Sequence, residues 1–498
     1  MTPRTAIASA CLPLGLAGTV GALLAAAGSV VASQWFPLGS ARQVEPTPGM
    51  AVNWLYLVAG AVMTTGFTVL VAAVSSTSTM RGRGAAGAPR RSVIVTRLSD
   101  WGLPVPLVTG ARFALERGRG ANALPVRPAL VGAVVGVLGV GSVLVFSHGI
   151  HHAVDDPELW GQTYQLFAFT GQGGNDFVPP EAVNRPISAL KGITGVDDGR
   201  VAAASLRGGG ASAELWSYQA GRKALPVTLL SGRMPESRTE VALAPDTMKA
   251  FTTSVGKSIT VTADKGEATL DVVGEAFVPH GPHNDFSSGG WVTDDGYDAL
   301  FNSFKFRIQF YSVDPTLLGT GAHAASAVNA ALTKSNPELA KGGPVVGTPE
   351  SQHLGYRDKA AQLERVGGLP TALAAFLALL AIGTVGHSLA TAVHRRRKDI
   401  AVLRAIGMTR WQTRGIVVAH ATTLVAVGVI FGIPLGLAIG RWSWRVVANY
   451  TPVLYDPPTD LLSLSLIMPA ALVVAYFVAS WPTIRASRLQ VAAVLRAE

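Results

Sequence analysis

Cysteine and charged residues are both scarce in this sequence. Cys11 is the only cysteine among 498 residues, and Asp, Glu, Lys and Arg together make up 14%. A disulfide within the chain is therefore excluded, so each domain has to be stabilised by its own core. Hydrophobic residues instead reach 49%, with a mean hydropathy of +0.34, and they are clustered in uninterrupted blocks. This composition is typical of a polytopic membrane protein.

The sequence also lacks the motifs of common hydrolases and nucleotide-binding enzymes. Gly256-Lys257-Ser258 matches the end of a phosphate-binding loop, but Phe251 stands where that loop needs its first glycine. Without this glycine the backbone cannot wrap its N–H groups around a phosphate. There is no GxSxG motif and no set of phosphoryl-transfer residues. We therefore expect no catalytic residues and no cofactor bound by this chain.

Metal-binding patterns are absent as well. Two clusters combine histidine with aspartate, and their members are His280, His283 and Asp285, and His151, His152, Asp155 and Asp156. Imidazole and carboxylate groups can bind zinc, but neither cluster has an HExxH-like or CxxC-like spacing that would place its members on one element. We interpret them as solvated loop residues, and we predict no metal site.

Six blocks free of Asp, Glu, Lys and Arg are each near the ~20 residues that a helix needs to cross a bilayer. They are Ala6–Val31, Ala51–Ser75, Leu130–Ser147, Leu369–Val393, Gly415–Gly440 and Leu461–Pro482. The first block has about 26 residues, whereas the apolar region of a cleaved signal peptide has ~7–15. We therefore expect six transmembrane helices, the first of them uncleaved.

The distribution of positive charge predicts the orientation. Met80–Arg127 has nine arginines and two acidic residues, and His394–Arg414 has seven basic residues and one acidic residue. His151–Arg365 has 18 basic and 24 acidic residues. Because basic loops stay in the cytoplasm during insertion, both termini and both basic loops should lie inside, and the acidic segment outside. The net charge of +10 lies mostly in loops that flank the membrane, so we do not expect nucleic-acid binding. We expect a multi-pass protein of the plasma membrane.

The same pattern divides the chain into domains. We expect an N-terminal helix pair over 1–79, a basic cytoplasmic linker over 80–127, a third span over 128–150, an extracytoplasmic domain with a stalk over 151–365, and a membrane domain over 366–498. Short β-rich runs separated by turn residues predict an α+β fold for the outer domain. These runs are Val227–Leu230, Thr239–Leu243, Ser258–Val261, Ala268–Val273 and Phe306–Val313. Helical patterns cover Val108–Glu116, Ala322–Thr333 and the stalk Arg357–Arg365.

Glycines at four-residue spacing mark faces where membrane helices could pack closely. Gly132 and Gly136 lie in the third span, and Gly432, Gly436 and Gly440 lie in the fifth. Without side chains at these positions, two helices can approach backbone to backbone. The alternative is chance alignment in a chain with 55 glycines. Pro434 predicts a kink in the fifth span.

Other polar and aromatic residues of the membrane region leave two interpretations open. His387 and His420 lie in the fourth and fifth spans, where structural packing is favoured over a proton relay. The predicted outer loop Arg441–Asp460 contains four aromatic residues, Trp442, Trp444, Tyr450 and Tyr455. Such side chains favour the headgroup region, so interfacial anchoring is favoured over a ligand cage.

The segment from Arg395 to Arg410 reads RRRKDIAVLRAIGMTR and separates two spans. Ile400, Leu403 and Ile406 recur at three-residue spacing on one helical face, and Gly407 is placed to end that helix. Thr409 can cap the following helix. The pattern predicts a cytoplasmic helix, a sharp bend and a second helix that enters the membrane. A lever moved by a partner and a basic loop that only fixes the topology both fit this pattern.

This segment resembles the FtsX-like permease family of ABC transporters, of the MacB type, whose own segment reads approximately R-R-R-E-I-G-V-L-R-A-I-G-A-T-R. The shared residues are Arg396, Arg397, Ile400, Val402, Leu403, Arg404, Ala405, Ile406, Gly407, Thr409 and Arg410. The departures are Asp399 for Glu, Ala401 for Gly and Met408 for Ala. The resemblance continues in Gly432–Gly440 and in the C-terminal run WPTIRASRLQVAAVLRAE, where Val491 replaces the usual proline. Phe113–Val137 and Gly232–Leu243 are similar to the regions that lead into and form the extracytoplasmic core domain. Overall, the chain resembles the second permease unit of the long members, preceded by two extra spans.

The resemblance implies a permease subunit that binds a separate ABC ATP-binding subunit, on which ATP and Mg would be held. Motion driven by ATP would enter at the coupling helix 395–410 and reach the outer domain, for export or extraction of a hydrophobic or amphiphilic substrate. The coupling residues would be Arg397, Asp399, Ile400, Leu403, Arg404, Ile406, Gly407, Thr409 and Arg410. A homodimer or a paired permease is implied, and an extracytoplasmic protein partner is compatible with it. The alternative is a scaffold that transmits force to an extracytoplasmic enzyme or sensor without transport.

Overall fold

The computed structural model describes residues 3–35, 49–50, 52–82, 92–116, 126–221, 223–352, 354–366, 368–459 and 461–487. Contacts divide the chain into two compact units. The bundle unit comprises residues 1–144, 368–437 and 461–498, and the sheet unit comprises residues 145–367 and 438–460. Parts of the predicted linker, residues 83–91 and 117–125, and the C-terminal residues 488–498 lie outside the described residues.

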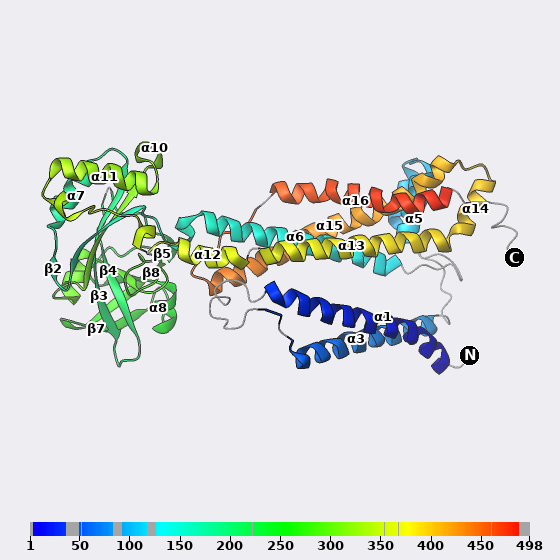
Figure 1. The fold of residues 1–498 in the computed structure, drawn as a ribbon, viewed down its shortest axis with the longest axis horizontal. Coiled ribbons are helices and arrows are strands. Elements are labelled where there is room, and N and C mark those ends of the chain that lie inside the picture. The colour runs from blue at the N-terminus through cyan, green and yellow to red at the C-terminus, as the bar shows by residue number, and fades with distance from the viewer. Residues whose placement is uncertain are drawn as a thin grey trace. The chain divides into compact units, whose positions relative to one another are not determined.

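Within the part of the chain that the structure describes, six helical segments are long and apolar enough to cross a membrane. This confirms the six spans predicted from the apolar blocks. They are formed by α1 (Pro3–Ala32), α3 (Trp54–Gly82), α6 (Val126–Asp155), α12 (Arg357–Val366) with α13 (Gly368–Arg395), α15 (Arg410–Tyr450) and α16 (Leu461–Ser487) (Figure 1). α15 continues ten residues beyond the predicted block, since an apolar block marks only the part in hydrocarbon and hydrogen bonding extends the helix into polar surroundings. Pro434 lies inside this one continuous helix.

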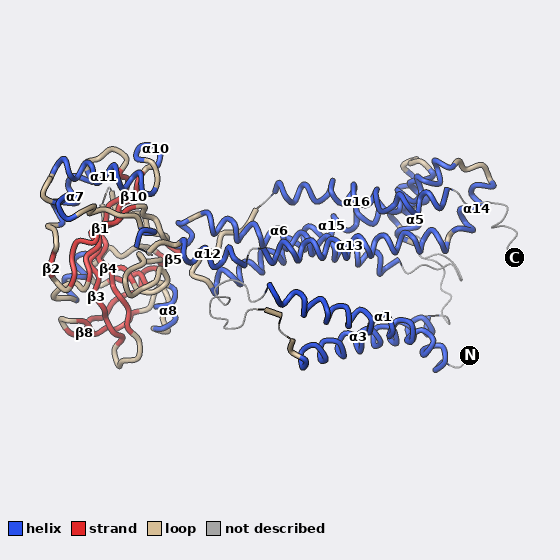
Figure 2. The backbone as a smooth tube through the Cα atoms, in the orientation of Figure 1, coloured by secondary structure: helices blue, strands red, loops and turns tan. Residues whose placement is uncertain are grey.

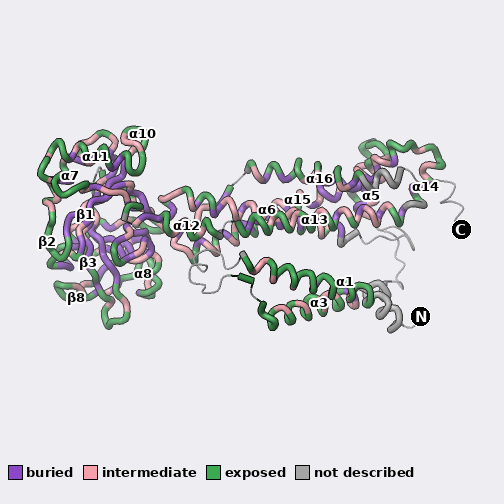
Figure 3. Tube along the Cα trace, in the orientation of Figure 1, coloured by how far each residue is buried: buried purple, intermediate pink, exposed green. Residues whose placement is uncertain are grey.

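Shorter helices lie between these spans. They are η1 (Ser33–Trp35), α4 (Val93–Asp100), α5 (Val105–Leu115) and α14 (Arg397–Ala405). α1 and α3 pack against each other, and most of their side chains are exposed (Figure 3). Apolar exposure of this extent is unfavourable in water and is the expected surface of helices that face lipid.

The bundle unit is held together by close contacts of small residues. A Cβ at Gly132 would lie 2.5 Å from Thr384 of α13, and a Cβ at Gly136 would lie 2.3 Å from the Ala381 Cβ. On α15, a Cβ at Gly432 would lie 2.7 Å from Val137 of α6. A Cβ at Gly436 would lie 2.9 Å from the Leu138 carbonyl oxygen. The predicted glycine positions of α6 and α15 thus lie where these helices contact each other and α13, while Gly440 lies buried further along α15.

We expect Gly136→Ala to destabilise the bundle by about 1–3 kcal/mol, because the added methyl overpacks the contact with Ala381. Gly383→Ala in α13 is the matched control, since no atom lies within 4 Å of its Cβ position. The control should be neutral or stabilising by up to about 1 kcal/mol. Thermal unfolding of the two variants in detergent measures the difference, and equal melting temperatures would contradict this packing.

The described strands of the sheet unit form one mixed sheet of ten strands (Figure 2). Its strands are β1 (Leu166–Gln172), β2 (Asn175–Asp176), β3 (Ile193–Leu206), β4 (Ser212–Tyr218), β5 (Leu229–Gly232), β6 (Glu240–Leu243), β7 (Ser258–Ala263), β8 (Gly266–Ala276), β9 (Gly290–Thr293) and β10 (Phe306–Val313). The order is β2-β1-β10-β3-β4-β9-β6-β8-β5, and β7 pairs with β3 and β8. β4–β9 and β6–β8 are parallel, while the other neighbours are antiparallel. The predicted α+β class is therefore confirmed.

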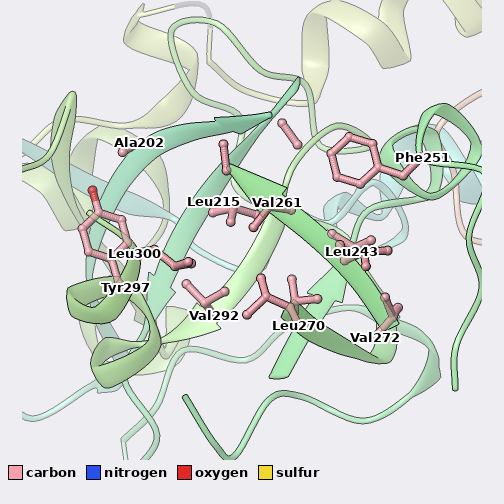
Figure 4. Close-up of a cluster of buried hydrophobic side chains, with 14 of the residues drawn as sticks. Ala202, Leu215, Leu243, Phe251, Val261, Leu270, Val272, Val292, Tyr297 and Leu300 are labelled. Atoms are coloured by element: carbon pink, nitrogen blue, oxygen red, sulfur yellow. The ribbon is translucent and has the colours of Figure 1, made fainter. Parts of the chain in front are cut away.

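Helices of the sheet unit complete its cores. They are α7 (Pro180–Ser188), α8 (Pro245–Ala250), α9 (Asp294–Leu300), α10 (Pro315–Leu318) and α11 (Gly321–Ser335), with the short turns η3 (Pro157–Trp160), η4 (Leu339–Gly342) and η5 (Pro349–Gln352). One core gathers apolar side chains from β3, β4, β6, β7, β8 and β9 with α8 and α9 (Figure 4). A second lies between β1, β10, α7 and α11. With its own cores, the unit needs no disulfide.

The Gly256-Lys257-Ser258 sequence has a structural role. Gly256 has φ +89° in a turn, and Ser258 begins β7, where its hydroxyl donates to Asp271 Oδ1 at 2.6 Å. A phosphate-binding loop would be followed by a helix whose N-terminus faces the phosphate. Here a strand follows, so the match does not form such a loop.

Candidate functional site

The chain turns sharply between α13 and α15, and we call residues 396–411 the elbow. α14 covers Arg397–Ala405, and Gly407 has φ +109°, a conformation that favours glycine and ends the helix. Thr409 then caps α15: its Oγ1 accepts from the Gln412 N–H at 3.2 Å, and Gln412 Oε1 accepts from the Thr409 N–H at 2.9 Å. These reciprocal bonds form a capping box. The structure thus has the helix, bend and second helix expected from the sequence.

One side of the elbow packs into the bundle unit. Ile400 and Ala401 are fully buried, and Ile400 lines a small apolar cavity together with Leu389 of α13 and Val417 of α15. Burial of these side chains fixes α14 to both neighbouring spans. A movement of α14 would therefore displace α13 and α15 as well.

Arg396 fixes the start of α14 to α5. Its side chain is buried, its guanidinium lies 4.0 Å from the ring centroid of Phe113, and its Nη2 donates to the Glu116 carbonyl oxygen at 3.2 Å. The Glu116 carboxylate accepts from the Ser92 N–H at 3.1 Å and pairs with Arg112 at 3.5 Å. The sequence matched Arg396 to the family segment but did not predict its role, because its partners come from α5 and the residue after it, about 280 residues earlier in the chain.

The other side of the elbow is exposed and apolar. Val402 is exposed, and Ile406 and Trp411 are 79% and 78% exposed. The sequence predicted that Ile400, Leu403 and Ile406 share one helical face. This prediction is wrong, because Ile400 is buried in the bundle while Ile406 is exposed. Buried packing selects the inner face, and helical spacing alone cannot say which face that is.

The remaining coupling residues surround this exposed side. Asp399, Gly407, Thr409 and Arg410 are exposed, and Leu403 and Arg404 are half-buried. The backbone of Arg397 begins α14, and its side chain lies outside the described residues. His387 is exposed on α13, while His420 is buried beside Ile416 and Phe113. The two histidines therefore differ in surroundings and do not share one buried face.

The sheet unit includes the ends of α6, α12 and α15, which pack together in what we call the stalk. Its buried core is formed by Ile150, Ala153, Leu159, Trp160, Phe277, Phe286, Tyr356, Ala360, Trp444, Ala448 and Val453. Trp160 Nε1 donates to the Ala153 carbonyl at 2.6 Å, and the Leu454 N–H donates to the Leu159 carbonyl at 2.7 Å. The stalk core thus packs the ends of α6 and α15, together with α12, against Phe277, which follows β8, and against Phe286 in the next loop.

The predicted outer aromatic loop is partly wrong. α15 continues through Tyr450, so Trp442, Trp444 and Tyr450 lie on a helix. Trp444 is fully buried in the stalk core, where its ring meets Phe146 edge-on at 6.3 Å between centroids. Trp442 and Tyr450 are exposed, as interfacial anchoring would require. Tyr455 stacks against Arg445, 4.6 Å from the guanidinium.

The candidate metal residues belong to the stalk and its surroundings. Asp285 pairs with Lys359 of α12. His280 stacks on Phe286 at 5.4 Å between centroids, and burial lowers its pKa. His152 lies 3.1 Å from Asp456. Among the described residues, no group of three or more His, Cys, Asp or Glu could hold a metal ion.

Comparisons with known proteins identify the class of the C-terminal part. Residues 371–491 match the FtsX-like permease C-terminal family, a range that contains most of α13, the elbow, and all of α15 and α16. No curated protein matches the chain. A similar solved structure is the crystal structure of the extracellular domain of the noncanonic ABC-type transporter YknZ from Gram-positive bacteria. It has 12% sequence identity and a TM-score of 0.25, and the match covers 37% of this chain and 98% of that chain. The chain thus has six helices able to cross a membrane among its described residues, and its residues 371–491 are similar to the C-terminal part of FtsX-like permeases.

Proposed function

We propose that this chain is the permease subunit of an ABC transporter and transmits the motion of a separate ATPase to an extracytoplasmic domain. The observation that carries this proposal is the elbow, which lies inside the segment matched by FtsX-like permeases. It presents an exposed apolar surface and is buried on its other side between two membrane helices. A surface of this kind is expected to be covered by a partner protein. In this proposal ATP and Mg are held by the partner, and this chain contributes no catalytic residue.

Two further features support transmission of force. α6 and α15 are continuous helices that contribute both to the bundle unit and to the stalk. Within the sheet unit, the stalk core packs these helix ends against strand and loop residues. Packed cores resist deformation and move as rigid bodies. A shift of α13 and α15 at the elbow would therefore move the sheet unit.

The orientation in this proposal follows the positive charge of the linkers, with the elbow and both termini in the cytoplasm and the sheet unit outside. We further propose that the chain is of the MacB type, corresponds to the second permease unit of long members, and acts as a homodimer or beside a paired permease. An apolar cavity of about 320 Å³ lies between α6, α13, α15 and α16. This lining favours a hydrophobic or amphiphilic substrate over a polar one.

The exposed side of the elbow should be required for binding the ATPase. We expect the double substitution Val402→Asp and Ile406→Asp to abolish copurification with a co-expressed ABC ATP-binding subunit, because the carboxylates would be desolvated in the interface. Both side chains are exposed, so the variant should fold and insert as the wild type does.

The matched control is Leu317→Asp, which adds a carboxylate at an exposed apolar position of the sheet unit. It should copurify like the wild type. Undiminished copurification of the double variant would refute the proposed interface. Labelling of an Ile406→Cys variant by an impermeant reagent from outside intact cells would refute the orientation.

A further inference from the structure

The helices α4 and α5 carry an exposed apolar surface although neither is among the membrane-spanning helices. Its residues are Val93, Trp101, Leu103, Val105 and Leu107, and we call this surface the α4–α5 patch. Trp101 is 75% exposed and Val105 is 64% exposed. Large apolar side chains exposed to this extent on two neighbouring helices are unfavourable in water and indicate a docking surface.

The packing of α5 on α15 indicates where the α4–α5 patch lies relative to the membrane. A Cβ at Gly110 would lie 2.5 Å from the Ala419 Cβ and 2.7 Å from the Ile416 carbonyl oxygen, so the two helices touch closely there. A Cβ at Gly415 would lie 3.2 Å from Pro106. Residues 415–420 are the first of the charge-free block of α15, directly after Arg414. α5 therefore lies beside the turns through which α15 enters the hydrocarbon.

The charges near the patch fit this depth. Arg97 of α4 is exposed, as is Arg410, which precedes Gly415 by five residues on α15; the exposed Asp100 beside Trp101 is the acidic residue of α4. Arginine side chains at the membrane surface interact with lipid phosphates, and tryptophan favours the headgroup layer. An apolar face bordered by such residues is typical of a helix that lies in the interface.

We propose that the α4–α5 patch docks on the phospholipid headgroup layer of the inner leaflet, with Trp101 inserted as its anchor and Arg97 and Arg410 on the lipid phosphates. The leaflet assignment rests on the proposed function, which places the elbow in the cytoplasm. Through Phe113 and Glu116, α5 also holds Arg396 at the start of α14. The same lipid layer therefore supports the side of the elbow that packs into the bundle.

The test uses the full chain with Cys11→Ser, which removes its only cysteine. A Trp101→Cys variant and an Ile406→Cys variant are labelled with an environment-sensitive fluorophore and placed in phosphatidylcholine and phosphatidylglycerol nanodiscs. Ile406 is the matched control, because it is equally exposed but belongs to the surface proposed to bind the ATPase. Quenching is measured with nitroxide-headgroup lipids and, separately, with aqueous iodide.

We expect the label at position 101 to be quenched by nitroxide lipids and to be several-fold less sensitive to iodide than the label at position 406. Equal iodide quenching at the two positions would overturn the proposal. Protection at position 101 that appears only after an ABC ATP-binding subunit is added would show that the patch binds protein, and would overturn it as well. If the label at position 101 were protected from iodide but not quenched by nitroxide lipids, a second copy of this chain would cover the patch. This result would also overturn the proposal. Because nanodiscs expose both leaflets, this result does not depend on the ATPase interface, which the copurification experiment tests separately.

Discussion

Replacing Trp444 with alanine should destabilise the protein by about 3–5 kcal/mol, the range for truncating a buried aromatic side chain. Trp444 is 1% exposed, and it fills the space between the ends of α15 and α6. A Cβ at Gly149 of α6 would lie 2.7 Å from its ring, so glycine is required for this approach. Alanine would leave a cavity that the surrounding helix ends cannot close without moving.

Trp442→Ala is the matched control for this prediction. Trp442 lies on the same helix two residues earlier and is 67% exposed. Both substitutions remove the same atoms from the same helix, so their difference measures only the buried contacts. The control should change the free energy of unfolding by no more than about 0.5 kcal/mol in detergent. Similar losses of stability for the two variants would show that the stalk core is not packed as described.

These two tryptophans show what the sequence could and could not predict. Six spans follow from charge-free blocks, because every residue in hydrocarbon has to be apolar and each block is long enough. The end of α15 was predicted as a loop, because Arg441 and Arg445 interrupt the apolar run. In the structure the Arg441 Nε donates to the Pro458 carbonyl at 3.2 Å, and Arg445 stacks on Tyr455. Contacts with residues later in the chain thus satisfy both charges and let the helix continue.

The sheet was predicted less completely than the spans. β6, β7, β8 and β10 were predicted from runs rich in β-branched or aromatic residues, and the predicted run Val227–Leu230 overlaps only the start of β5. β1, β2, β3, β4 and β9 were missed, although β3 is the longest strand described. Its middle contains Asp197, Asp198 and Gly199, which are unfavourable in strands. Pairing with β10 on one side and β4 on the other overrides these local preferences.

The elbow shows a similar limit. Its helix, bend and cap depend on neighbouring residues, so the sequence predicts them. Which side of α14 is buried depends on α5 and α15, and that information is not local. The role of Arg396 and the exposed position of Trp411 therefore required the structure.

Asp197 should make the sheet unit less stable as the pH rises, and Asp197→Asn should remove this dependence. The side chain is fully buried in β3. Its Oδ1 accepts from the Gln219 N–H at 2.9 Å, whereas the structure gives Oδ2 no hydrogen-bond partner. Burial, with smaller contributions from Asp294 and Asp198, raises the pKa of this carboxyl group from 3.8 to about 8, against the opposing Gln219 bond.

The direction follows from proton binding. Between about pH 4 and pH 8 the folded protein keeps the Asp197 proton, whereas the unfolded chain has lost it. The contribution of Asp197 to stability is therefore complete below pH 4. As the pH rises through 8 this contribution is lost, by about 1.4 kcal/mol for each pH unit between the two pKa values. Asparagine keeps an acceptor for the Gln219 N–H and cannot ionise. The variant should accordingly exceed the wild type in stability above pH 8, by on the order of 3–5 kcal/mol.

Proteolysis of the full chain at low protease concentration, between pH 5 and pH 9, measures this effect, because slow cleavage tracks the equilibrium population of the open sheet unit and hence its free energy of unfolding at each pH. Asp264→Asn is the control, since this aspartate is exposed in a turn between β7 and β8, and it should retain the pH dependence of the wild type. A wild type whose stability is constant over this range, or an Asp197→Asn variant that falls in parallel with it, would mean that Asp197 is ionised in the folded protein. Since an ionised carboxylate at this site would need a partner for Oδ2, the packing around β3 would then have to differ from the one described.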